Sequence, residues 1–274
     1  MNHPRRALLI LLVLVLHVGC GEEPATEGST TEEPTTAPAA TSSSLDYVAF
    51  GDSLATGYGI TDSYVYRYAS LMGTDTGTTV NVRNLGVNGL TSQQLRAGIE
   101  NDQRAKDAVE QAEVITINIG ANDLMRARWE YRTGNCGGAD NQDCLRQAVD
   151  EFRANWDAIL ADIAGTRSPG TTIIRTIDFY NPFVDVDRAI SSGDGSVDDF
   201  VIFKKYLEQV NSHIAKSSDA YDIPHTEVYE TFNGPNGDED PSRKGYITSD
   251  GVHPSEDGHA AIAQELRKLA YEPL

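Results

Sequence analysis

The chain has 274 residues, of which 39% are hydrophobic, and this length is enough for one sizeable core. Its 41 acidic residues outnumber its 22 basic residues, so the formal net charge at pH 7 is −19. Apart from Arg5 and Arg6 the sequence contains no basic cluster, which argues against a nucleic-acid partner. An acidic surface of this size also disfavours anionic substrates that approach through bulk solvent.

The N-terminal part of the sequence predicts an export signal. Arg5 and Arg6 precede the apolar run of residues 7–16, which is too short for a helix that spans a bilayer core of roughly 30 Å and is typical of a signal peptide. Residues 21–44 consist only of Gly, Glu, Pro, Ala, Thr and Ser, a composition that predicts disorder. We therefore expect a signal peptide over residues 1–19, a linker segment over residues 20–44 and the folded domain over residues 45–274.

Cys20 lies between the apolar run and the linker, and this arrangement resembles a bacterial lipoprotein. The resemblance implies that Cys20 is lipidated and that the anchor holds the domain at a membrane, outside the cytoplasm. His17 stands three positions before Cys20, where the lipoprotein motif usually has leucine. The alternative is ordinary signal-peptide cleavage, which would give a secreted protein.

Two cysteines remain in the folded domain, Cys136 and Cys144. Exported chains meet an oxidising environment, so we expect these two residues to form a disulfide that closes a small loop. A zinc site is the competing interpretation, but no further ligands stand at zinc-finger spacing.

Strand-like and helix-like patterns alternate from residue 45 onward. Apolar or β-branched runs predict five strands, at residues 45–50, 78–84, 113–119, 171–177 and 223–229. Helical periodicity predicts helices at residues 64–72, 92–99, 102–111, 145–164, 197–217 and 256–269. Gly165 is expected to end the longest of these helices. The alternation implies an α/β fold with a five-stranded parallel sheet in the order 2-1-3-4-5, covered by helices on both faces.

The loops after the first three predicted strands carry groups suited to nucleophilic catalysis. Ser53 stands at a turn after the first strand, Gly89 stands where a helix is expected to begin, and Asn122 follows the third strand. With the expected strand order, these loops meet at the switch point of the sheet, where ligands bind. The backbone N–H groups of Ser53 and Gly89 and the amide of Asn122 would then stabilise an oxyanion, at on the order of 3 kcal/mol for each donor.

A nucleophilic serine also needs a base, and four histidines follow the signal peptide: His213, His225, His253 and His259. The first two fall inside a predicted helix and a predicted strand, which indicates structural roles. His253 lies in a turn with Asp250 three residues earlier, so the carboxylate can accept the Nδ1 proton and leave Nε2 free as a base. His259 is the main rival. Because the base must be neutral, activity should fall as the pH drops through the ordinary histidine range near ~6.5.

Four short blocks occur in the order that is typical of one enzyme family: Gly51-Asp52-Ser53, Gly89, Gly120-Ala121-Asn122 and Asp250-Gly251-Val252-His253. Together they resemble the SGNH (GDSL-type) hydrolases over residues 46–269. The resemblance implies a flavodoxin-like three-layer α/β/α domain, no metal or other cofactor, and ester hydrolysis through an acyl-enzyme. It makes Ser53 the nucleophile, His253 the general base and Asp250 the residue that orients it, with Ser53, Gly89 and Asn122 as the oxyanion hole.

Two further acidic residues, one inside a block and one directly after a block, have expected structural roles. We expect Asp52 to hold its turn by hydrogen bonds and Asp123 to cap the segment after the third strand.

Substrate choice is expected to lie in three longer segments, at residues 125–144, 181–196 and 230–249. The first carries Trp129, which either lines an acyl or sugar pocket or packs only within its own loop. The principal hypothesis is an esterase or lipase that acts on small-molecule or lipid esters. The alternatives are a carbohydrate O-acetylesterase or acyltransferase of the cell envelope, with an acylated-glycan substrate, and a binding lipoprotein without activity.

Overall fold

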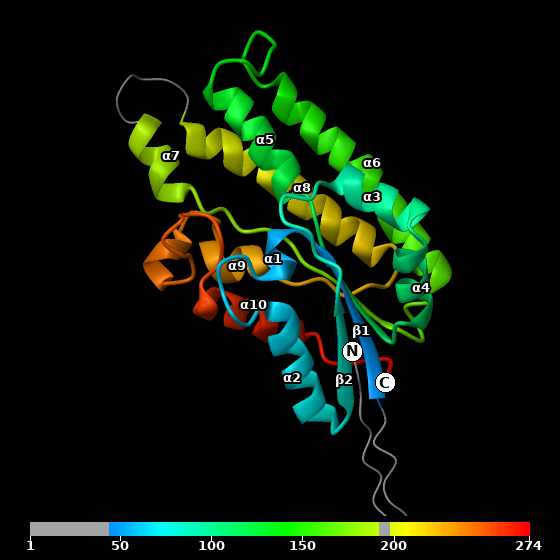
Figure 1. Ribbon diagram of the computed structural model, residues 1–274. Coiled ribbons are helices and arrows are strands. Elements are labelled where there is room, and N and C mark those ends of the chain that lie inside the picture. The colour runs from blue at the N-terminus through cyan, green and yellow to red at the C-terminus, as the bar shows by residue number, and fades with distance from the viewer. Residues whose placement is uncertain (1–43, 192–197) are drawn as a thin grey trace, which may run out of the picture. The chain divides into compact units, whose positions relative to one another are not determined.

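The structure is a computed structural model that describes residues 44–191 and 198–274 (Figure 1). The expected signal peptide, Cys20 and the linker up to residue 43 lie outside the described residues. Within the two described ranges, no helix is long and apolar enough to cross a membrane.

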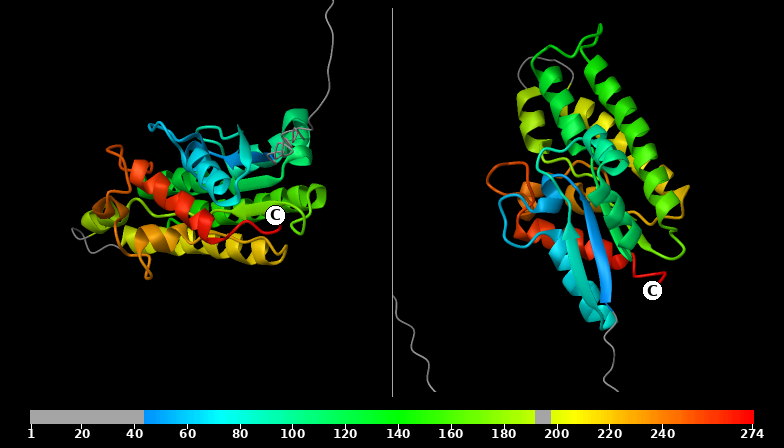
Figure 2. Two further views of the ribbon diagram at one scale, coloured as in Figure 1. Left: turned by 90° about the horizontal axis from the view of Figure 1, so that it is seen from below. Right: turned by 45° about the vertical axis from the view of Figure 1, so that its right-hand side comes forward.

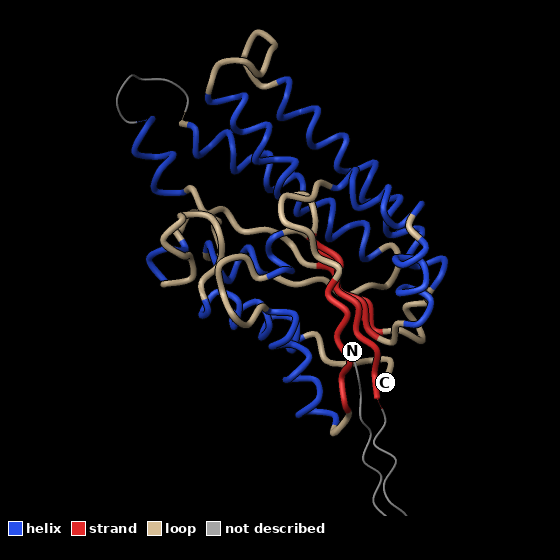
Figure 3. Tube along the Cα trace, viewed as in Figure 1, coloured by secondary structure: helices blue, strands red, loops and turns tan. Residues whose placement is uncertain are grey.

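A parallel sheet forms the centre of the fold, in the order β2-β1-β3-β4. Its strands are β1 (Ser44–Gly51), β2 (Thr79–Asn84), β3 (Val114–Asn118) and β4 (Ile173–Thr176). Tyr47 aligns with Val82 on one side and with Val114 on the other, so all strands run in the same direction. The predicted α/β fold with a parallel sheet is therefore confirmed, and the loops at the carboxyl ends of the strands gather at one edge (Figure 3).

The prediction of a fifth strand is wrong. The chain meets β4 at one isolated bridge, between Thr176 and His225, and Thr226 N–H donates to Thr176 O at 3.0 Å. Beyond this point the buried carboxylate of Asp178 accepts the N–H groups of Val228 and Tyr229, at 2.8 and 3.0 Å. These bonds start helix α9 (Val228–Asn233) and take the N–H groups that a longer strand would have used for pairing.

Helices cover both faces of the sheet, which gives three layers (Figures 1 and 2). In β1, Val48 and Phe50 face one core while Tyr47 and Ala49 face the other, as the alternation of a strand requires. The first core is covered by α3 (Ser92–Asn101), α4 (Gln103–Gln111), α5 (Ala121–Arg132), α6 (Asp143–Thr166) and α8 (Asp199–Asp219). The second core is covered by α2 (Tyr64–Thr76), α9 and α10 (Glu256–Lys268).

Some helices differ from the prediction. Helix α5 and helix α7 (Val184–Ser191) occupy segments that were expected to be loops. Helix α6 continues through Gly165, and the N–H of its C-cap Arg167 donates to Ile163 O at 2.8 Å. The helix ends there because Pro169 follows two residues later and cannot continue it. Two short helices, α1 (Ser53–Thr56) and the 3-10 helix η1 (Pro241–Lys244), complete the fold.

Candidate active site

Ser53 is the first residue of α1, directly after the carboxyl end of β1. The preceding Asp52 caps this helix, because its Oδ1 accepts the N–H of Leu54 at 3.0 Å. Gly51 allows β3 to approach the turn closely, since a Cβ atom at this position would lie 2.1 Å from Oδ1 of Asn118. The turn that presents Ser53 is therefore held both by a cap and by the adjacent strand.

His253 and Asp250 lie on one tight turn that precedes α10. The turn is closed by the N–H of Thr248, which donates to His253 O at 2.8 Å. Asp250 Oδ1 accepts the N–H groups of Val252 and His253, at 2.8 and 2.9 Å, and its Oδ2 lies 2.6 Å from Nδ1 of the imidazole. Desolvation alone would raise the pKa of Asp250, but these bonds and the Thr248 hydroxyl together lower it well below its usual value.

The imidazole of His253 reaches from this turn to Ser53. Its Nε2 lies 3.0 Å from Ser53 Oγ, and the two residues are 200 positions apart in the sequence. Because Nδ1 donates to the Asp250 carboxylate, Nε2 carries a lone pair and can accept the hydroxyl proton. The ring of Tyr58 covers the imidazole, with 4.6 Å between the ring centroids. The structure therefore brings together Ser53, His253 and Asp250, which the sequence motifs had indicated. Tyr58 belongs to no motif, so the sequence analysis missed it.

Ser53 and Gly89 line one cavity, and each has a backbone N–H group. Among the described residues, no acceptor takes the N–H of Ser53 or of Gly89. Gly89 has φ +74°, a conformation that favours glycine, and it lines the same cavity as Ser53. The prediction that a helix begins at Gly89 is wrong by a few residues. Gly89 lies in a turn two residues before Thr91, which is the N-cap of α3.

The amide of Asn122 lies in the first turn of α5, on the same cavity. Its Nδ2 donates to Asp52 Oδ2 and to Leu90 O, both at 3.0 Å. An amide nitrogen has two hydrogens, so both are used in this state. Asn122 can stabilise an oxyanion only when the bond to Leu90 O opens or is shared.

A buried network centred on Asp52 connects this turn to β3 and α5. Asp52 Oδ1 also accepts Nδ2 of Asn118 at 3.2 Å, and Asn118 Oδ1 accepts the hydroxyl of Tyr64 at 2.8 Å. Burial raises the pKa of Asp52 to about 6, against the opposing effect of these hydrogen bonds. Asp52 therefore holds its turn by hydrogen bonds, as expected, and also holds the Asn122 amide.

A cavity of about 260 Å³ opens beside Ser53. Its polar lining is concentrated around Ser53, and the rest of its wall is largely apolar. The residues that line it are Asp52, Ser53, Leu54, Tyr58, Asn88, Gly89, Asn118, Ala121, Asn122, Leu124, Met125, Phe179, Tyr180, Pro182, Phe183, Phe203, Leu207, Val252, His253 and Pro254. The hydroxyl of Ser53, the imidazole of His253 and the backbone of Gly89 thus line one pocket.

Comparison with known proteins identifies the family. Residues 49–261 match the GDSL-like lipase/acylhydrolase family. The chain belongs to this family. The spore germination lipase LipC of Bacillus licheniformis is 26% identical to it over 232 residues, covering 83% of this chain and 97% of that protein. This GDSL-like protein is accordingly a carboxylic ester hydrolase.

Solved structures of similar fold include esterases of different kinds. The lipase Lip_vut3 from a goat rumen metagenome is 25% identical with a TM-score of 0.67, and the match covers 83% of this chain and 98% of that chain. The acetylxylan esterase Axe2 of Geobacillus stearothermophilus is 20% identical with a TM-score of 0.56, and the match covers 84% and 96% of the two chains. The second likeness concerns the fold alone.

The other histidines of this GDSL-like hydrolase lie away from Ser53. His213 Nε2 pairs with Asp157 at 2.7 Å on the surface, and His225 lies 3.7 Å from Asp219. His259, the rival base, is fully buried, and its Nδ1 accepts the N–H of Tyr64 at 3.1 Å. None of these three rings lines the cavity.

Asp123 differs from its expected role. Its carboxylate accepts the N–H and hydroxyl of Ser92 at 2.9 and 2.7 Å, so it supports the start of α3 and does not cap its own segment.

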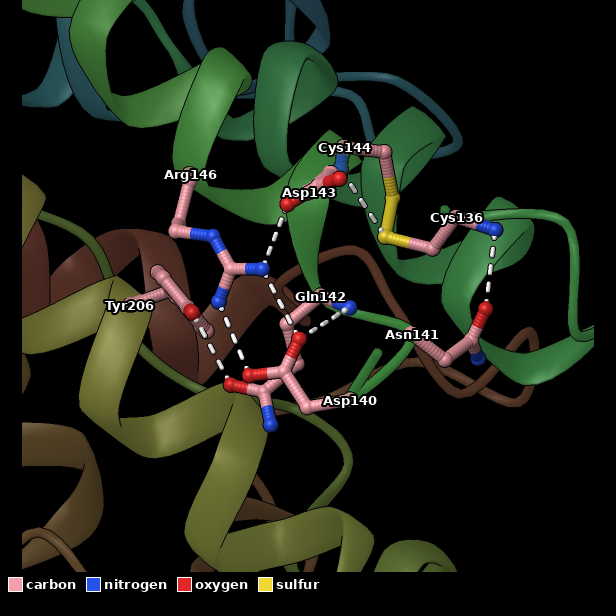
Figure 4. A network of polar contacts seen from close by, with 8 residues as sticks. All are labelled: Cys136, Asp140, Asn141, Gln142, Asp143, Cys144, Arg146 and Tyr206. Atoms are coloured by element: carbon pink, nitrogen blue, oxygen red, sulfur yellow. Dashed lines mark hydrogen bonds and ion pairs between the residues drawn. A yellow bond between two sulfur atoms is a disulfide. The ribbon is translucent and has the colours of Figure 1, made fainter. Parts of the chain in front are cut away.

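The segment that carries the cysteines joins α5 to α6. The structure contains the expected disulfide between Cys136 and Cys144, whose Cα atoms are 4.8 Å apart. Arg146 pairs with Asp140 and Asp143 beside it (Figure 4). Within the described ranges, no three His, Cys, Asp or Glu side chains are arranged to hold a metal ion.

Proposed function

We propose that Ser53 is the nucleophile of this hydrolase, that His253 is its general base and that Asp250 orients the imidazole. The observation that carries the proposal is the 3.0 Å contact between Ser53 Oγ and His253 Nε2, combined with the 2.6 Å contact between Nδ1 and Asp250. A hydroxyl, an imidazole and a carboxylate in this order form a nucleophile with its base and orienting group.

The reaction then proceeds in two halves. Ser53 Oγ attacks the carbonyl carbon of the ester while His253 Nε2 takes its proton, and a tetrahedral intermediate forms. When the bond to the alcohol oxygen breaks, His253 returns the proton to the leaving alcohol, and the acyl group stays on Ser53. His253 next takes a proton from water, which attacks the carbonyl carbon of the acyl-enzyme. The bond to Ser53 Oγ then breaks, His253 returns the proton to Oγ, and the acid is released.

The charge on the carbonyl oxygen would be stabilised by the N–H groups of Ser53 and Gly89 and by the Asn122 amide. Support for the first two donors comes from their lack of acceptors among the described residues. Asn122 would exchange its bond to Leu90 O for a bond to the oxyanion and keep its bond to Asp52.

We infer that the enzyme works outside the cytoplasm, anchored through a lipid on Cys20. The signal-like N-terminus and the linker-like composition of residues 21–44 support this inference. The disulfide between Cys136 and Cys144 is consistent with an oxidising compartment. A Cys20→Ala variant that partitions into detergent as fully as the wild type would overturn it.

A second candidate is a carbohydrate O-acetylesterase or acyltransferase. A groove of about 640 Å³ with both polar and apolar lining adjoins the cavity, shares Asn122 and Met125 with it and contains Gln93 and Gln147. Trp129 lies in this groove with 69% of its surface exposed, and an exposed indole face suits stacking on a sugar ring. Hydrolysis of acetylated xylan, measured with and without an added alcohol acceptor, tests this candidate.

Labelling with a fluorophosphonate tests the proposed nucleophile directly. We expect one adduct on Ser53 in the wild type, none in Ser53→Ala and much slower labelling in His253→Ala. An activated aryl acetate should be hydrolysed by the wild type only. If folded Ser53→Ala turns over the aryl acetate at near wild-type rate, the assignment fails; if the wild type shows neither labelling nor turnover, the chain is a binding protein.

A further inference from the structure

We propose that the cavity beside Ser53 is an acyl site for a medium-length fatty acyl chain, such as octanoyl, and that Phe183 closes its far end. The inference rests on the proposed function of Ser53. It adds the class of substrate, an ester of a medium-chain fatty acid, and a residue that determines specificity.

The polar and apolar parts of the cavity wall are separated. The polar side chains in the wall are those of the turns around Ser53, with Asn88, Asn118 and Asn122. Most of the apolar wall comes from helices α5 and α8 and from the segment between β4 and α7, through Leu124, Met125, Phe179, Pro182, Phe183, Phe203 and Leu207. An ester carbonyl therefore fits the polar end, and an alkyl chain fits the rest.

The size of the cavity matches a chain of intermediate length. At roughly 30 Å³ for a group the size of a water molecule, 260 Å³ holds about eight or nine such groups. An acetyl group would leave most of this apolar wall without a partner. A palmitoyl chain has about twice as many carbon atoms as this volume holds.

Phe183 is fixed from behind by a buried ion pair. The Arg128 guanidinium lies 3.8 Å from the centroid of the Phe183 ring and pairs with Asp187, which is fully buried. On another side, the Phe203 ring packs edge-on against Phe183, with 5.9 Å between centroids. These contacts join α5, α7 and α8, and α8 lies beside both of the other helices (Figure 1). A ring held in this way cannot withdraw to admit a longer chain.

A series of p-nitrophenyl esters from acetate to palmitate tests the proposal on the full chain. We expect kcat/KM to rise from acetate to octanoate, by at most about fourfold for each buried methylene. Beyond octanoate it should fall. Phe183→Ala should move the optimum to dodecanoate or longer, whereas Phe183→Trp should move it to butanoate.

Phe200→Ala is the matched control. Phe200 is a buried phenylalanine, whereas Phe183 is partly buried; like Phe183 it packs under an arginine, Arg188, at 4.2 Å, but it does not line the cavity. This variant should keep the wild-type chain-length optimum, and thermal unfolding should show that all three variants are folded.

The outcomes separate this inference from the proposed function. If the Ser53→Ala variant still hydrolyses the esters, the assignment of Ser53 as nucleophile is refuted, and the acyl-enzyme on which this inference depends does not form. Hydrolysis that requires Ser53 but is fastest with acetate refutes the acyl site alone. The same holds if folded Phe183→Ala and Phe183→Trp both retain the wild-type optimum, or if Phe200→Ala shifts it as far as Phe183→Ala does.

Discussion

Replacement of the buried His259 is expected to change how the stability of this hydrolase depends on pH. Burial, assisted by the charge of Arg67, lowers the pKa of His259 to about 4, whereas an imidazole in the unfolded chain titrates near ~6.5. Between these two values the unfolded state binds more protons than the folded state. The stability that the neutral ring provides is therefore complete above pH ~6.5 and is lost as the pH falls toward 4.

The magnitude follows from the two pKa values. At ~1.4 kcal/mol per pH unit, the interval corresponds to about 3 kcal/mol in total, of which about 2 kcal/mol is lost between pH 7 and pH 5. Asp52 and Asp178 act in the opposite direction over this range, because burial raises the pKa of each to about 6. The quantity to measure is therefore a difference between two proteins, in which the contributions of these carboxylates cancel.

His259→Asn supplies the second protein, because it keeps an acceptor for the Tyr64 N–H but does not titrate. Urea unfolding of both proteins at pH 7 and pH 5 gives the two free energies of unfolding. We expect the wild-type value minus the variant value to shrink by about 2 kcal/mol on acidification. A difference that stays constant would refute the reasoning. The variant should also hydrolyse esters at pH 7, and a folded but inactive variant would transfer the role of base from His253 to His259.

Three further predictions concern the site and the segment beside it. Asn122→Ala should lower kcat by about 10²- to 10³-fold and should also lower the melting temperature, because Asp52 Oδ2 and Leu90 O lose their donor; a wild-type kcat would remove Asn122 from the oxyanion hole. Gly51→Ala would place a Cβ atom 2.1 Å from Asn118 Oδ1, so urea denaturation should show a clear loss of stability; wild-type stability would contradict this contact. Reduction of the Cys136–Cys144 disulfide should change ester selectivity more than melting temperature, since it closes a loop of sequence separation 8; unchanged kinetics with both thiols free would argue against that role.

The strands of the sheet could be predicted from the sequence, but α5 and α7 could not. Residues 47–51 of β1 and all of β3 and β4 are buried, and apart from Gly51, Asn118 and Arg175 they are apolar or β-branched. Helix α5 has no such pattern, because its buried face includes Arg128. This charge is tolerated only because Asp187 on α7 pairs with it, 59 positions away in the sequence. Hydrophobic periodicity within one segment gives no information about an ion-pair partner that far away in the sequence.

The sequence predicted which residues form the site better than it predicted their hydrogen bonds. Strand order brings the loops after β1, β2 and β3 to one edge, so the proximity of Ser53, Gly89 and Asn122 follows from topology. The partners of each polar atom depend on side-chain positions that no pattern encodes. For this reason the sequence did not reveal that Asp52 and Leu90 O occupy both amide hydrogens of Asn122, or that Asp123 bonds to Ser92.

The position of the Asn122 amide depends on the charge of Asp52. Both oxygens of this carboxylate accept from N–H donors, which belong to Leu54, Asn118 and Asn122, and none of these donor groups can accept a proton in return. All three bonds persist only while Asp52 is ionised. Since burial raises the pKa of Asp52 to about 6, acidification below that value places a proton on one of these oxygens and displaces a bond. Disruption of the network that aligns the proposed oxyanion donor with Ser53 is therefore one origin of the loss of activity expected in acid.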